Sequence, residues 1–136
     1  MENKKSYDIV EFFNKFNEPY FIDCFNKLTT ELREKISFDI KILNASIQFT
    51  KENSTFSACG FRRSKNYFFV EFYNENSITD KKIVREVKPD RVYQGKKIDY
   101  RISRVEIRNE IEIDEELIEW IVKSYKLVEK LDNAST

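Results

Sequence analysis

The sequence of 136 residues contains no histidine. This absence excludes Ser–His and Cys–His nucleophile pairs, together with metal sites that require an imidazole ligand. Glycine is almost as scarce, because Gly60 and Gly95 are the only two and stand far apart. Neither a P-loop nor a Rossmann-type glycine-rich turn is therefore expected. Carboxylate, tyrosine, lysine and thiol chemistry remain, and we assign no catalytic residue, no cofactor and no metal from the sequence.

Cysteine and long apolar runs are also scarce. Cys24 and Cys59 are the only cysteines, and they are not spaced as a CxxC motif. We expect two small, buried, reduced side chains rather than a disulfide or a redox pair. No apolar run approaches the roughly 18 residues that cross a bilayer, and the first residues lack the apolar core of a signal peptide. We therefore expect a cytoplasmic protein with no membrane partner.

Apolar side chains make up 40% of the chain, which at this length suits a single domain over residues 1–136. In the first third they recur at spacings of three and four. This pattern predicts one helix over residues 6–17, capped by Ser6, and a second over residues 19–36, begun by Pro19. We expect the two helices to form a hairpin.

From residue 38 the apolar period changes to two, which is typical of strands. The pattern predicts an antiparallel meander of about five strands, with a bulge at Asn44. In the last strand, Ile102, Val105 and Ile107 alternate imperfectly with charged residues, which indicates one buried face and a local irregularity. The predicted strands cover residues 38–50, 56–62, 67–73, 83–87 and 101–108.

A C-terminal helix is predicted from residue 114 onward. Asp114 is a good N-cap, and Glu115 and Glu116 favour the positive end of the helix dipole. These carboxylates also suit acid–base or metal chemistry, but their place in a first helical turn makes capping the better account. An apolar stripe follows at Leu117, Ile121, Tyr125 and Val128. The fold class is therefore α+β, with an N-terminal helical hairpin, an antiparallel meander sheet and a C-terminal helix packed on it.

Residues 56–72 read FSACGFRRSKNYFFVEF, and the final block contains YRISRV, IDEEL, WI and SY. These runs resemble the strand, basic turn, strand and closing helix of a bacterial domain family of unknown function that is often labelled "predicted transport protein". The resemblance covers about residues 28–130. It implies a small α+β domain that occurs alone or after nuclease-like modules in apparent defence or DNA-associated proteins. The family has no catalytic signature to carry over.

The run KNYFFVEF, which begins at Lys65, matches the RNA-recognition consensus K/R-G-F/Y-G/A-F-V-x-F/Y except at its second and fourth positions. If Tyr67 and Phe69 faced solvent, unpaired bases would stack on them at about 1 to 3 kcal/mol per base. The order of elements differs from that fold, which places a helix between its first two strands. We favour the other interpretation, in which Phe68, Val70 and Phe72 face an apolar layer while Tyr67, Phe69 and Tyr73 are covered by the N-terminal helices or half exposed.

The net charge of zero conceals a gradient along the chain. Residues 81–108 carry ten Lys or Arg and four acids, a net of +6 (10 − 4), whereas residues 109–136 carry three bases and eight acids, a net of −5 (3 − 8). A basic surface that holds phosphate groups is one interpretation. The other, which we favour, is that strand arginines pair across the sheet or with the acidic helix. The possible binding surface comprises Arg62, Arg63, Lys65, Tyr67, Phe69, Arg85, Arg91, Arg101 and Arg104.

Two hypotheses about function remain open. The first is a non-enzymatic interaction module for a protein or a nucleic acid, which predicts an open basic face. The alternative is a small enzyme in which Glu71, Tyr73, Tyr93 and Tyr100 converge under the loop at residues 94–99, which predicts a concave site. A homodimer formed through the aromatic strand over residues 67–73 is a further possibility.

Overall fold

The computed structural model of the chain describes residues 9–16, 18–52, 54–62, 67–74, 83–87, 92–93, 96–97 and 101–134. Its helices are α1 (Ile9–Phe16), α2 (Pro19–Arg33), the 3₁₀ helix η2 (Glu110–Glu112) and α3 (Glu115–Ala134). Its strands are β1 (Asp39–Ile42), β2 (Ser46–Lys51), β3 (Ser54–Arg62), β4 (Tyr67–Asn74), β5 (Ile83–Val87), β6 (Val92–Tyr93), β7 (Lys96–Lys97) and β8 (Arg101–Ile107). The fold is α+β, as the sequence predicts. None of the helices described is long and apolar enough to cross a membrane.

Within the described residues, the main sheet has six strands in the order β1–β2–β3–β4–β8–β5, and all neighbouring strands are antiparallel. The first four strands form the expected meander. The last strand of the chain then inserts between β4 and β5, so the meander prediction fails at this edge. An internal place suits β8, because Ser103, Val105 and Ile107 give it a fully buried face that continues the core face of β4.

Two local predictions for the strands are wrong. Asn44 lies in the turn of the β1–β2 hairpin, which is closed by a hydrogen bond from the Leu43 N–H to the Ser46 carbonyl, and the bulge falls instead between Phe49 and Thr50. The ladder of β8 with β4 is regular, and the irregularity lies in β5. Ile102 therefore belongs to the opposite face of the sheet from Val105 and Ile107.

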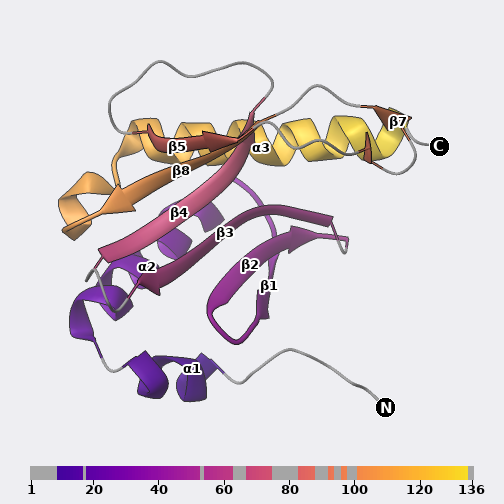
Figure 1. Cartoon of the computed structure of the whole chain (residues 1–136). Coiled ribbons are helices and arrows are strands. Elements are labelled where there is room, and N and C mark those ends of the chain that lie inside the picture. Colours follow the sequence, from indigo (N-terminus) through magenta and orange to yellow (C-terminus); the bar gives the residue numbers. More distant parts are fainter. Residues whose placement is uncertain are drawn as a thin grey trace, which may run out of the picture.

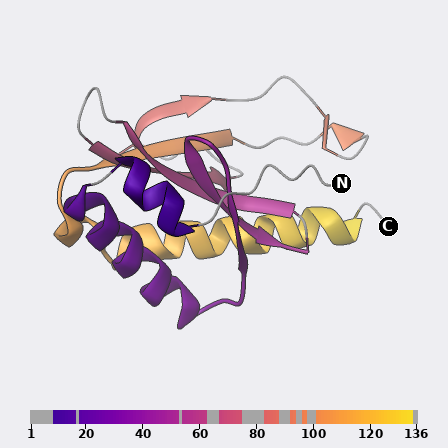
Figure 2. The same cartoon turned by 90° about the horizontal axis from the view of Figure 1, so that it is seen from below.

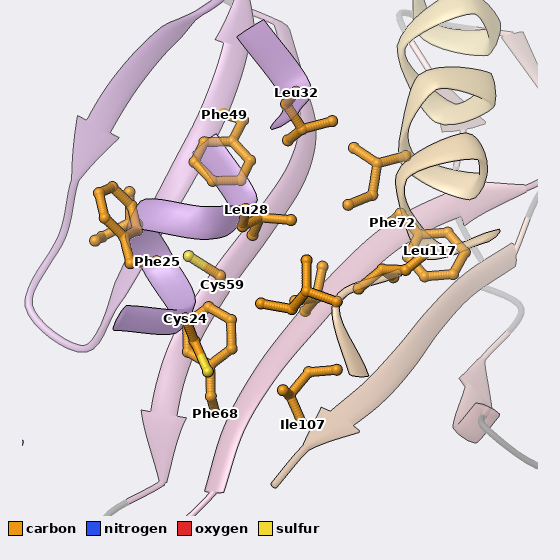
Figure 3. Packing of buried hydrophobic residues seen from close by; sticks show 14 of the residues in the cluster. Cys24, Phe25, Leu28, Leu32, Phe49, Cys59, Phe68, Phe72, Ile107 and Leu117 are labelled. Carbon is orange, nitrogen blue, oxygen red and sulfur yellow. The ribbon is translucent and has the colours of Figure 1, made fainter. Parts of the chain in front are cut away.

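Helices α2 and α3 cover one face of the sheet, behind the strands in Figure 1 and below them in Figure 2. The buried residues of α2, β3, β4, β8 and α3 meet in one hydrophobic cluster between these layers (Figure 3). In β4, Phe68, Val70 and Phe72 point into this cluster, as predicted. The ring of Phe72 stacks on Trp120 of α3, with 5.6 Å between the ring centroids.

The N-terminal helices meet through phenylalanines. Helix α1 ends at Phe16 and α2 begins at Pro19, whose fixed φ and missing N–H suit a first helical position. The ring of Phe13 lies 5.5 Å from that of Phe21 and 5.2 Å from that of Phe25, both in T-shaped contacts. The two helices thus share their apolar faces as the predicted hairpin requires, although α2 ends at Arg33 rather than at residue 36.

A buried serine of α3 joins the helix to two strands. Strands β3 and β4 pair as far as Ser57 and Phe72 and then diverge (Figure 1). At this point the backbone N–H of Tyr73 donates to Ser124 Oγ at 2.9 Å, and the Ser124 hydroxyl donates to the carbonyl of Phe56. Ser124 therefore satisfies two backbone groups that the diverging strands no longer pair with each other.

The N-terminus of α3 is fixed as the sequence predicts. Asp114 Oδ1 accepts a hydrogen bond from the Leu117 N–H at 3.0 Å, which is the N-cap contact. In the stripe, Leu117, Ile121 and Val128 are buried and Tyr125 is half-buried. The helix therefore docks through the predicted face.

Both cysteines are buried and free, as expected. Burial raises the pKa of the Cys24 thiol to about 12, and burial also raises the pKa of Cys59. Both thiols therefore stay protonated at neutral pH and pack as small apolar groups.

Candidate functional site

We call the face of the sheet that points away from α2 and α3 the outer face. Phe69 of β4 lies on this face opposite Gly60 of β3. A Cβ atom at Gly60 would lie 2.6 Å from the ring carbon Cζ of Phe69 and 2.9 Å from the carbonyl oxygen of Ala45. A glycine is thus required here, because the phenylalanine ring occupies the space that a side chain would take.

A guanidinium covers the exposed side of the same ring. The Cζ atom of Arg104 lies 4.1 Å from the ring centroid of Phe69. Glu71 holds that guanidinium in place, because its Oε2 atom lies 2.6 Å from the terminal nitrogen NH2 and 2.8 Å from Nε of Arg104. Phe69 is therefore only 7% exposed, enclosed between Gly60 and Arg104.

Tyr67 is covered in the same way at the end of the strand. The guanidinium Cζ of Arg108 lies 4.8 Å from the ring centroid of Tyr67, and its NH2 atom lies 3.0 Å from Oε1 of Glu106. The Arg108 side chain is itself 54% exposed. Arg62, the ladder partner of Tyr67 in β3, is also exposed. We call Arg62, Tyr67 and Arg108 the cationic corner.

Of the nine residues proposed for a binding surface, the structure brings Arg62 and Tyr67 together in this corner and places Phe69 under Arg104. The expectation that the N-terminal helices cover the two rings is wrong, because α2 lies on the opposite face of the sheet. Arg104 of β8 covers Phe69, and Arg108, which follows β8, covers Tyr67. Base stacking directly on the two rings is therefore blocked, because Tyr67 is only 5% exposed and Phe69 only 7%. Arg104 pairs across the sheet with Glu71, as the favoured interpretation of the strand arginines predicts.

The other basic residues do not join the corner. Arg101 begins β8, and Arg108 follows the last residue of that strand, Ile107. The six residue steps from Arg101 to Ile107 span about 20 Å along the strand, so Arg101 lies far from the corner. Arg85 of β5 pairs with Arg104 in the ladder. The remaining predicted residues, Arg63, Lys65 and Arg91, lie outside the described residues.

Of the four residues in the carboxylate–tyrosine alternative, the structure places the side chains of Glu71 and Tyr73. The Glu71 carboxylate is engaged by Arg104, and Tyr73 packs against the edge of the core. The side chains of Tyr93 and Tyr100 and the loop that leads between them fall outside what the structure describes. Among the described residues, no three Cys, Asp or Glu side chains gather as a possible metal site.

A dimer formed through β4 is not available, because this strand is internal. Strand β3 pairs with one edge of β4 and β8 with the other. The aromatic side chains of β4 that were expected to be exposed are buried or partly buried. Any contact between copies must use another surface.

A second surface feature was missed from the sequence. A groove of about 420 Å³ lies where the chain leaves α2 and passes α3, and it is lined by Lys35, Ile36, Glu119, Val122, Lys123 and Lys126. Three lysines against one glutamate make its rim basic. The spacing of Lys123 and Lys126 was visible in the sequence as one exposed helix face, but the approach of residues 35–36 to this face was not. Below we call this site the lysine groove.

Arg108 belongs to the basic segment that the sequence suggests as a phosphate-holding surface, but its place over Tyr67 was not predicted. Its role depends on the β4–β8 ladder, in which Ile107 lies opposite Phe68, so that Arg108 comes next to Tyr67.

Comparison of the chain with protein-family models, with curated proteins and with solved structures finds no match in any of the three. What the protein does must therefore be inferred from its own side chains.

Proposed function

We propose that this protein is a non-enzymatic binding module that holds single-stranded nucleic acid at the cationic corner. The observation that carries the proposal is the Arg108 guanidinium, which lies over the Tyr67 ring at 4.8 Å from Cζ to the ring centroid and is half exposed, beside the exposed Arg62. A half-exposed guanidinium held over a ring can take a base on its open side, and its remaining N–H groups can reach a phosphate.

The charge around the corner favours an anionic ligand. The connection between β3 and β4 contains Arg63 and Lys65 in its sequence and no acid. Among the described residues, Arg62 makes no ion pair, and Glu106 offsets only one of the positive charges. Because the chain as a whole is neutral, we expect modest affinity with a clear salt dependence rather than the tight binding of a strongly basic protein.

Single strands suit the corner better than duplexes. Bases of an unpaired strand can be turned outward to stack on a guanidinium, whereas the bases of a duplex are already stacked on each other. Arg62 at the end of β3 and Arg108 just after β8 lie on either side of Tyr67 in β4, which matches a short contact with a few nucleotides. We likewise propose, from the sequence resemblance, that the chain belongs to the domain family found beside nuclease-like modules and that it acts in the cytoplasm.

Charge reversal tests the proposal. Binding of a fluorescent oligothymidylate is measured by anisotropy at several salt concentrations for the wild type, Arg62→Glu and the control Lys41→Glu. Lys41 is exposed on the edge strand β1, so its reversal makes the same change in charge away from the corner. We expect Arg62→Glu to lower the affinity and to reduce the slope of log K against log salt by about one, while Lys41→Glu stays near the wild type. Equal losses in the two variants would mean that only overall charge matters.

A further inference from the structure

The exposed face of α3 changes sign along its length. Glu116, Glu119, Lys123 and Lys126 are all exposed and follow one another at spacings of three and four, so they form one stripe along the helix. The first half of this stripe is acidic and the second half is basic. Two such helices that run antiparallel would place the acidic half of each against the basic half of the other.

The lysine groove lies beside the middle of this stripe. Ile36 and Val122 line it and are each half-buried, while Lys35, Lys123 and Lys126 surround them. An ion pair already links the end of α2 to α3, but it is long and exposed: Lys35 Nζ lies 3.9 Å from Oε2 of Glu115. The surface thus combines a small apolar centre with charges of both signs, which is the usual anatomy of a protein interface.

We propose that two copies of this chain associate through this surface, with their α3 helices antiparallel. A twofold axis close to residue 121 places Glu119 of each copy opposite Lys123 of the other, and Glu116 opposite Lys126. Val122 and Ile36 then meet their own counterparts near the axis. Each contact occurs twice, as a closed isologous dimer requires.

The pattern of charge indicates that the partner on this surface is a second copy of the same chain. A groove with lysines alone would fit many acidic partners, but the stripe is complementary to itself only in the antiparallel direction. Helix α3 is accessible for this contact, because α2 and α3 lie at the surface on the helical side of the sheet (Figure 2). The apolar centre is small, so the dimer is weak and falls at the lower end of specific interfaces.

A charge swap tests the dimer. Sedimentation velocity is recorded up to about 0.5 mM protein at low and at high salt for the wild type, Glu119→Lys, Lys123→Glu and the double variant that carries both changes. We expect a monomer–dimer equilibrium for the wild type that weakens with salt. Each single change places like charges opposite each other and should weaken the dimer at least tenfold, whereas the double variant restores both pairs and should dimerise like the wild type.

Two results would overturn the proposal. One is a wild type that keeps the mass of a monomer at the highest concentration. The other is a double variant that remains folded by circular dichroism but dimerises no better than the single variants. The Lys41→Glu variant serves as the control for a change of net charge, because Lys41 lies on β1 and not on α3. Nucleic-acid binding by the monomer is measured separately, so failure here leaves the cationic corner unaffected.

Discussion

Replacing Ser124 with alanine removes only one oxygen atom but should lower the free energy of unfolding substantially, because that oxygen bonds two backbone groups. The Ser124 hydroxyl accepts from the N–H of Tyr73 and donates to the carbonyl of Phe56, at the point where β3 and β4 separate. The serine is 0% exposed, so water does not replace the missing oxygen without rearrangement. Two backbone groups would be left without a partner in the interior.

The magnitude follows from the number of groups left unsatisfied. Each buried polar group without a partner costs about 1 to 3 kcal/mol. With two such groups and some relaxation of the strands, we expect Ser124→Ala to lower the free energy of unfolding by about 2 to 4 kcal/mol. At a urea m-value of about 2 kcal/mol per molar, the midpoint would move down by about 1 to 2 M.

Urea unfolding followed by the fluorescence of Trp120 measures this change, because the indole stacks on Phe72 in the core. Thr55→Val is the control: it replaces one hydroxyl of β3 by a methyl group, and that hydroxyl bonds only to the Gln48 side chain at 3.3 Å and belongs to a half-buried residue. We expect a loss of at most about 0.5 kcal/mol there. If the two variants lost equal stability, the bridging role of Ser124 would be refuted.

Three further changes have expected outcomes. Gly60→Ala should cost about 1 to 3 kcal/mol in urea unfolding, because its Cβ would lie 2.6 Å from the Phe69 ring and 2.9 Å from a backbone carbonyl oxygen; an unchanged midpoint would contradict this packing. Asp114→Ala should cost about 1 kcal/mol through loss of the N-cap of α3, and Asp114→Asn should restore most of it. Burial raises the pKa of Tyr20 from 10.0 to about 12, so the folded state holds this proton more tightly than the unfolded state. Its contribution to stability is complete below pH 10 and is lost as the pH rises toward 12; Tyr20→Phe should flatten this part of a stability–pH curve, and an equally steep curve would be inconsistent with the shift.

Elements whose signals are local could be predicted from the sequence. Helix α3 begins at its own cap, Asp114, and its apolar stripe repeats at helical spacing, so neither feature depends on the rest of the chain. The same holds for the start of α2 at Pro19 and for the alternation in β4. These patterns are sufficient for the fold class and for the core face of each element.

The order of the strands and the candidate site could not be predicted, because both depend on pairing between distant residues. The insertion of β8 between β4 and β5 joins segments that lie far apart in the sequence. That ladder brings Arg108 to Tyr67 and Arg104 to Phe69, and it therefore decides which rings are covered. Likewise, the lysine groove exists only because the chain after α2 passes α3.

The functional proposal depends on the Arg108 guanidinium that lies over Tyr67. One substitution tests whether its planar shape matters as well as its positive charge. Arg108→Lys keeps the positive charge but removes the planar group that rests on Tyr67. The measurement is the affinity of the wild type and of this variant for the same oligonucleotide, single-stranded and as a duplex, at low salt. We predict that the wild type prefers the single strand and that Arg108→Lys loses this preference while retaining the weaker, charge-driven binding. A wild type that binds neither form at low salt, or a lysine variant with the full preference for single strands, would contradict the proposal.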